Sequence, residues 1–234
     1  MNTEGKNPAF LSKKKIVLRT IAGLGLFFAI LFVPAGSVRW PQAWVFVSFY
    51  LSAVAGFFVW TKKRDPGLLK ERISPRKNVK AWDQKIIRIY SFFLVAMTVL
   101  AGLDAVRFRW SRVTLGFNLV GFAGLVLAMW LAFWATSENT FASSVVRIQT
   151  DRGHRVCSTG PYAHVRHPMY VGVILSIICF PLALGSFFAL IPAGIIVGLF
   201  ILRTFLEDKA LQEELPGYKE YAQKVRFKLI PGVW

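Results

Sequence analysis

Long apolar runs, nearly free of charged residues, are the feature that most restricts how this chain can fold. About 17 to 25 residues of helix are needed to cross a hydrocarbon core of roughly 30 Å. Four runs have that length: residues 16–33, 43–60, 86–103 and 115–135. Because lipid offers the backbone no hydrogen-bond partners, such runs must be helical. The pattern predicts an all-α integral membrane protein.

A fifth apolar run, residues 171–202, is too long for one ordinary span. It is interrupted by Pro181, Gly185 and Pro192, which predict a tight helical hairpin made of two shortened spans. The chain is therefore expected to have about six transmembrane helices, four spans plus this C-terminal hairpin. We divide it into an N-terminal four-span region, residues 1–136, and a C-terminal region, residues 137–234, with a cytoplasmic loop, the hairpin and a helical tail.

Positive charge is distributed unevenly along the chain. The net charge of +17 would suit a nucleic-acid-binding protein if the cations formed one footprint. Instead, 25 of the 29 Lys and Arg residues fall in segments that share one side of the membrane when the amino terminus is inside. This pattern follows the positive-inside rule and predicts cytoplasmic N- and C-termini. We expect membrane lipids, and no nucleic acid, as the partners of this charge.

Four arginines do not follow that rule and fall on the opposite side: Arg39, Arg107, Arg109 and Arg112. Their conflict with the positive-inside pattern is softened by the neighbouring Asp104.

The stretch GPYAHVRHPMYVG, residues 160–172, lies at the start of the predicted hairpin. Arg166, His167 and Tyr170 come close together there, where desolvated polar groups need partners or a ligand. Pro168 suits the first turn of a helix, whose free amides could bind an anion. Two interpretations stay open: a binding site, or lipid-phosphate contacts with Tyr162 and Tyr170 as interfacial anchors.

A second group of charged residues follows the hairpin. Arg203 and Glu207 are four residues apart on one helix face, and Asp208 is beside them. Because the hairpin begins and ends on the same side, Arg166 and His167 are expected to meet Glu207. The result would be a mixed-charge pocket able to hold a zwitterion. The alternative is an ordinary helical Arg-Glu pair worth a few tenths of a kcal/mol.

Three histidines, His154, His164 and His167, raise the alternative of a metal site. Cys157 is solitary and no HExxH pattern is present, so we expect no metal.

The cytoplasmic segments show two further local patterns. Around "TDRG", the stretches "VVRIQ" and "HRVC" predict a small β-hairpin. The last long helix is expected to continue to Leu215, break at residues 216–217, and restart with Tyr218, Tyr221 and Val225 on one face.

Taken together, GPYAHVRHPMYVG, the apolar hairpin and RTFLEDKALQEELPGYKEYAQKVRFKLIPGVW resemble the membrane methyltransferase family that includes isoprenylcysteine carboxyl methyltransferases and phospholipid methyltransferases. The resemblance covers residues 137–234 in detail. It implies S-adenosylmethionine as cofactor, held between the C-terminal membrane helices and the cytoplasmic tail. The cofactor-binding residues that it implies are Gly160, Tyr162, Arg166, His167, Pro168, Tyr170, Glu207, Asp208, Tyr218 and Tyr221.

The resemblance also implies methyl transfer to a lipophilic small-molecule or lipidated acceptor, first of all an isoprenylcysteine-type carboxylate. Arg166 or Arg203 could orient such a carboxylate, whereas a thiol or a phospholipid amine would need Glu207 or His167 as proton acceptor. The Gly-x-Gly of the phospholipid enzymes is missing, and "GFAG" at residues 121–124 is its nearest substitute. A non-catalytic lipid-binding or transport protein is the alternative from another class.

Overall fold

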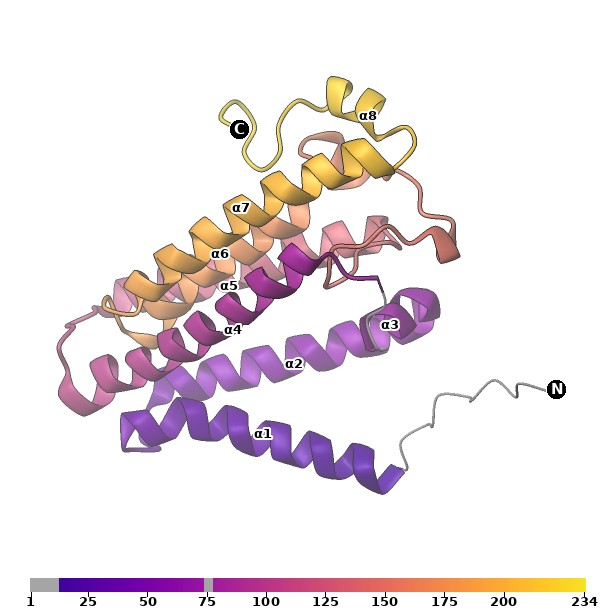
Figure 1. The fold of residues 1–234 in the computed structure, drawn as a ribbon. Coiled ribbons are helices and arrows are strands. Elements are labelled where there is room, and N and C mark those ends of the chain that lie inside the picture. The colour runs from indigo at the N-terminus through magenta and orange to yellow at the C-terminus, as the bar shows by residue number, and fades with distance from the viewer. Residues whose placement is uncertain (1–12, 74–77) are drawn as a thin grey trace.

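The computed structural model describes residues 13–73 and 78–234, and its regular structure there is entirely helical (Figure 1). The helices are α1 (Lys13–Ala35), α2 (Pro41–Arg64), α3 (Pro66–Ile73), α4 (Ala81–Gly102), α5 (Leu115–Glu138), α6 (Pro168–Leu184), α7 (Leu190–Glu214) and α8 (Tyr218–Lys224). The predicted all-α class is confirmed. Figure 1 shows α4 to α7 packed side by side, and the contacts place α1 against α4 and α2 against α5 and α6.

Four helices in the described ranges are long and apolar enough to cross a membrane: Pro41–Arg64, Ala81–Phe108, Leu115–Glu138 and Leu190–Glu214. Three of them contain the predicted spans 43–60, 86–103 and 115–135. Two shorter apolar helices, Thr20–Ala35 and Pro168–Leu184, correspond to the first predicted span and to the first arm of the hairpin. At 1.5 Å per residue α6 is about 25 Å long, which is shorter than an ordinary hydrocarbon core.

The predicted C-terminal hairpin is present as α6 and α7, which pack against each other. Gly185 ends α6 with a φ of 87°, a left-handed conformation that suits glycine. The amide of Ser186 then donates to the carbonyl of Pro181 at 2.9 Å, which closes the turn. As a result, the start of α6 and the end of α7 lie at the same end of the bundle (Figure 1).

Small residues let α5 and α6 pack closely along their length. A Cβ at Gly121 would lie 2.3 Å from the amide nitrogen of Ala183, and one at Gly124 would lie 2.2 Å from Cys179 Sγ. Glycines at such contacts are typical of close helix packing in membranes. The GFAG segment therefore packs two helices together.

The predicted β-hairpin around residues 150–153 is wrong, because α4 occupies backbone groups that a ladder would use. Asp83 on α4 accepts a hydrogen bond from the amide of Val146 at 2.8 Å, and the amide of Lys80, which precedes α4, donates to the carbonyl of Val146 at 3.2 Å. Just before the predicted strand, Arg203 on α7 donates to the carbonyl of Ser144 at 3.1 Å. Residues 150–152 form a single 3-10 turn. The loop is thus held by the helices rather than by a strand partner.

The restart of the chain after α7 is confirmed. The helix ends at Glu214, Gly217 adopts a φ of 80°, and α8 begins at Tyr218. Tyr218 and Tyr221 are buried on the same face of α8.

Candidate active site

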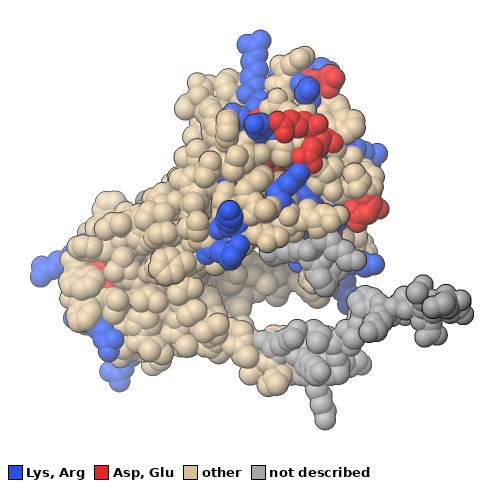
Figure 2. Space-filling view, viewed as in Figure 1, with Lys and Arg blue, Asp and Glu red and all other residues tan. Residues whose placement is uncertain are grey.

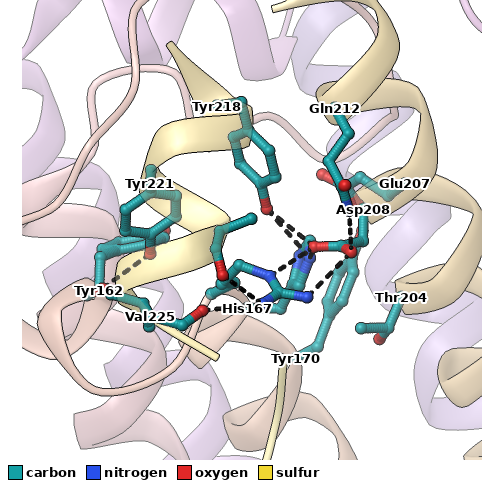
Figure 3. Close-up of polar contacts among 12 residues, drawn as sticks. Tyr162, His167, Tyr170, Thr204, Glu207, Asp208, Gln212, Tyr218, Tyr221 and Val225 are labelled. Carbon is teal, nitrogen blue, oxygen red and sulfur yellow. Dashed lines mark hydrogen bonds and ion pairs between the residues drawn. The ribbon is translucent and has the colours of Figure 1, made fainter. Parts of the chain in front are cut away.

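A pocket opens at the end of the bundle that carries α8. Its walls are the loop after α5, the start of α6, the end of α7 and α8, and the space between them, with its open mouth, is about 720 Å³. Seven of the residues implied by the resemblance line it: Tyr162, Arg166, His167, Tyr170, Glu207, Tyr218 and Tyr221. The two groups of residues predicted before and after the hairpin therefore meet in one place (Figure 3).

Asp208 is the centre of the hydrogen bonds behind this pocket (Figure 3). Its Oδ1 lies 2.7 Å from Arg166 Nε and 3.3 Å from His167 Nε2. The hydroxyl of Tyr218 donates to the same oxygen at 3.1 Å. Oδ2 accepts from Arg166 Nη2 at 3.0 Å and from Gln212 Nε2 at 2.8 Å. Because Asp208 is 2% exposed and does not line the pocket, it positions the side chains that do.

Glu207, the preceding residue, points into the pocket instead. Successive helical side chains are about 100° apart, so neighbouring acids on α7 face different surroundings. Glu207 accepts a hydrogen bond from the hydroxyl of Tyr170. Arg166 and His167 meet Glu207 in the lining of one pocket, as expected, but the carboxylate that they contact directly is that of Asp208.

Arg203 does not pair with Glu207 either, and it does not line the pocket. Its guanidinium forms two hydrogen bonds with Asp83, Nε to Oδ1 at 2.7 Å and Nη2 to Oδ2 at 3.2 Å. It also lies over the ring of Tyr170, 5.2 Å from the centroid. Asp83 is 0% exposed, so this is a fully buried ion pair between α4 and α7. Its partners indicate that Arg203 supports the pocket wall at residues 144–146.

Arg166 is also largely occupied by the protein. Its Nη1 donates to the carbonyls of Val225 at 2.7 Å and of Arg226 at 2.9 Å, and its backbone amide donates to that of Phe227 at 3.0 Å. Burial lowers the pKa of Arg166, but its hydrogen bond to Asp208 and the charge of that carboxylate outweigh burial and raise the pKa overall. Arg166 is therefore a permanently charged clamp that ties the tail to the start of α6.

Three tyrosines form the apolar side of the pocket. The hydroxyl of Tyr221 donates to the carbonyl of Tyr162 at 2.7 Å, which joins α8 to the turn before α6. Burial raises the pKa of Tyr162, Tyr218 and Tyr221, so all three remain neutral phenols at neutral pH.

Besides Asp208, two residues implied by the resemblance, Gly160 and Pro168, lie outside the pocket lining. Gly160 has a φ of 55°, and a Cβ there would lie 2.6 Å from Cγ of Glu138. Pro168 is the first residue of α6, as its fixed φ favours. Both residues fix the backbone conformation next to the lining residues Tyr162 and His167.

Sequence reasoning missed the loop wall of the pocket, residues 139–157. Phe141 and His154 pack there with ring centroids 4.7 Å apart. Burial, and then the charges of Arg152 and Arg147, lower the pKa of His154 to about 4. His154 is consequently neutral at neutral pH. This loop has no helical or strand periodicity, so only its mixture of arginines and apolar residues hinted at a role.

Two arginines of the loop wall, Arg147 and Arg155, differ in whether they have ion-pair partners. Arg147 donates to Glu71 on α3 and to Asp151, with nitrogen to oxygen distances of 2.7 Å and 2.9 Å. Arg155 lines the pocket but makes no hydrogen bond or ion pair within the described ranges. The lining therefore offers one unengaged cation, Arg155, and one carboxylate, Glu207.

No group of three or more His, Cys, Asp or Glu side chains in residues 13–73 and 78–234 is placed to hold a metal ion.

The sequence profile of the isoprenylcysteine carboxyl methyltransferase family matches residues 119–213. A comparison with curated proteins finds no match. The matched segment runs from α5 through the loop and the hairpin to the end of α7, so it contains both predicted charged groups but not α8. Methyl transfer by a membrane protein is the general kind of reaction that this family indicates. The resemblance inferred from the sequence is confirmed: over residues 119–213 the chain matches the isoprenylcysteine carboxyl methyltransferase family.

Proposed function

We propose that this protein is an S-adenosylmethionine-dependent membrane methyltransferase that acts on a lipophilic acceptor, most of all an isoprenylcysteine-type carboxylate. The observation that carries the proposal is the pocket itself. Most of its lining belongs to the family-matched segment and the rest to α8 and the turn before it, and it joins a carboxylate, a free guanidinium and several tyrosine rings at the end of apolar helices.

The lining residues fit the chemistry of that cofactor. Its amino acid end is a zwitterion, for which Glu207 can bind the ammonium group and Arg155 the carboxylate. Its sulfonium is a cation, which the faces of tyrosine rings attract. Tyr218 provides such a ring in the lining, whereas the ring of Tyr170 is already covered by Arg203. Because Arg166 and Arg203 are engaged with Asp208 and Asp83, Arg155 is the better candidate for a carboxylate.

When bound, S-adenosylmethionine supplies an electrophilic methyl group. The residues of this chain then have to orient the acceptor and exclude water, which can supply most of the rate enhancement. A carboxylate acceptor already has its attacking lone pair and needs no base. If the acceptor is a thiol or an amine, Glu207 is the lining carboxylate that can accept its proton, with Tyr170 hydrogen-bonded to it.

We further propose six membrane spans, formed by α1, α2, α4, α5, α6 and α7, with both termini in the cytoplasm. The pocket would then lie at the inner leaflet. Apolar side chains on the outward face of the hairpin support access from the bilayer, since Ile178, Ile201 and Leu202 are exposed. A lipophilic acceptor could reach the pocket sideways along this face.

Calorimetric titration of S-adenosylmethionine into the purified chain tests the proposal. The Glu207→Gln variant removes the lining carboxylate, and loss of a charge-assisted contact should weaken binding at least about tenfold. Glu213→Gln is the matched control, because Glu213 is an exposed acid on the same helix that contacts only Lys209, at 3.9 Å. Failure of the intact protein to bind the cofactor, or equal weakening by both variants, would contradict the proposal.

A second experiment identifies the chemical class of the methyl acceptor. Membranes holding the protein are incubated with radiolabelled cofactor and with a prenylcysteine, a phospholipid amine or a small thiol. We expect the label in the methyl ester of the prenylcysteine. If the label appears only in the phospholipid amine or the thiol, the acceptor is not a carboxylate.

A further inference from the structure

The end of the bundle opposite α8 carries a second, polar pocket. Three connections meet there: the turn between α1 and α2, the segment between α4 and α5, and the turn between α6 and α7 (Figure 1). Figure 2 shows blue side chains at this end, separated by tan surface from those around α8. The space between the lining side chains, with its open mouth, is about 970 Å³.

Three of the four arginines that break the positive-inside pattern line this pocket: Arg39, Arg109 and Arg112. All three are exposed, and within the described ranges their guanidinium groups make no hydrogen bond or ion pair. We call this the distal arginine pocket. Three unpaired cations around one hollow raise its positive potential, because they repel one another and attract an anion.

The one acidic residue near the pocket does not neutralise it. Asp104 is 0% exposed and accepts hydrogen bonds from Ser111 Oγ at 2.7 Å and from Ser186 Oγ at 2.5 Å. It also accepts from the amides of Ser111 at 2.6 Å and Phe188 at 3.2 Å. Its carboxylate therefore ties the connections together, and the arginines keep their charge.

Backbone geometry at the pocket is unusual in two ways. Residues 103–108 form a π-helical turn at the end of α4, and Arg109 follows with a φ of 54°. A left-handed conformation is disfavoured for a non-glycine residue, and π-turns often occur at functional sites. Together they carry the chain around the pocket so that Arg109 and Arg112 both line it.

Exposed aromatic side chains cluster at this end of the bundle. Phe108 and Trp110 stack with centroids 5.0 Å apart, and Phe188 meets Trp110 at 5.6 Å. All three are more than a third exposed. Exposed aromatic belts of this kind are typical of the membrane interface, where phosphate groups are the main anions.

We propose that the distal arginine pocket binds a phosphate-bearing anion, either the headgroup of a phospholipid or free phosphate. Guanidinium groups match phosphate oxygens in geometry and charge. The inference does not depend on the methyltransferase proposal, because this pocket lies at the other end of the bundle.

The test uses the purified full chain in neutral detergent, with native mass spectrometry and titration of dioleoylphosphatidylglycerol. The double variant Arg39→Gln/Arg112→Gln should bind the tightest phospholipid at least about tenfold more weakly than the wild type. Arg107→Gln is the matched control, since Arg107 is an exposed arginine at the same end but outside the pocket lining. That variant should bind as the wild type does.

Two further ligands identify the chemistry recognised. Dioleoylglycerol, which lacks phosphate, should not bind at this site. Inorganic phosphate should displace the phospholipid if the free anion is an occupant, and failure to displace it assigns the pocket to headgroups. The proposal is overturned if the double variant binds phospholipid as tightly as Arg107→Gln, or if dioleoylglycerol binds as well as the phospholipid. The second comparison needs no variant, so it holds even if the double variant does not fold.

Discussion

The buried ion pair between Asp83 and Arg203 gives a prediction whose size follows from the structure. The two side chains are 0% and 6% exposed and their closest nitrogen and oxygen are 2.7 Å apart. Removing one partner of such a pair leaves a buried charge and costs about 3–5 kcal/mol. Asp83→Asn keeps an acceptor for the amide of Val146, and Arg203→Met keeps the apolar stem but loses the hydrogen bond to the carbonyl of Ser144.

The double variant Asp83→Asn/Arg203→Met should be more stable than either single variant. With both charges gone, no uncompensated ion remains, and apolar replacement of a buried pair is often close to neutral. We expect a total loss of about 1–2 kcal/mol in the double variant, and a coupling energy that exceeds about 2 kcal/mol.

Thermal unfolding in detergent measures this. For a chain of this size 1 kcal/mol shifts Tm by about 2–4 °C, so each single variant should lower Tm by roughly 6–20 °C. Lys80→Met is the control, because Lys80 pairs with Glu214 at the surface and exposed pairs contribute less than about 1 kcal/mol. Losses in the double variant that equal the sum of the single losses, within about 0.5 kcal/mol, would refute the reasoning.

Three further predictions concern stability and are read from Tm. Gly121→Ala should destabilise the protein because its new methyl group would press on Ala183, whereas Gly194→Ala, with nothing within 4 Å, should be neutral or stabilising. Asp104→Ala should cost more than Asp104→Asn, because only alanine leaves every one of its buried donors without an acceptor. His154 has its pKa lowered to about 4 in the folded state, so the unfolded chain binds more protons between pH 6.5 and 4 and stability falls on acidification. His154→Gln should reduce that fall, and an unchanged pH dependence would contradict it.

The membrane helices could be predicted because their cause is local. Long apolar runs must be helical in lipid, and Pro181, Gly185 and Pro192 are enough to divide residues 171–202 into two arms. The same reasoning predicted that a new helix begins at Tyr218, because Pro216 and Gly217 end the preceding helix whatever the tertiary structure around them. Each of these inferences needs only neighbouring residues.

The pairing of charges could not be predicted in the same way. Asp83 lies in a strongly basic segment and has the sequence context of a surface residue, yet α4 and α7 enclose it. The β-hairpin failed for the same reason, since Val146 finds its acceptor on α4 rather than on an adjacent strand. The sequence shows which residues need hydrogen-bond or ion-pair partners. Which residues become those partners depends on how helices that are distant in the sequence pack together.

The adjacent acids Glu207 and Asp208 show how this choice separates stability from binding. Asp208 accepts five hydrogen bonds, whereas Glu207 accepts one and lines the pocket. Asp208→Asn should therefore lower Tm and also weaken cofactor binding, because Arg166 loses its counter-charge and one of the two acceptor oxygens is replaced by an NH2 donor. Glu207→Gln should weaken binding but leave Tm within a few degrees, by roughly 1 kcal/mol or less, since its amide can still accept from Tyr170.

Unfolding and calorimetry on the same preparations separate the two roles. If Glu207→Gln lowered Tm as much as Asp208→Asn does, Glu207 would be structural and the lining would lack the carboxylate that a zwitterionic ligand needs. If Asp208→Asn weakened binding without changing Tm, Asp208 would have to contact the ligand, against its burial behind Arg166 and His167. Either result would contradict the assignment of a structural role to Asp208 and a binding role to Glu207, two adjacent acids that differ by one methylene group.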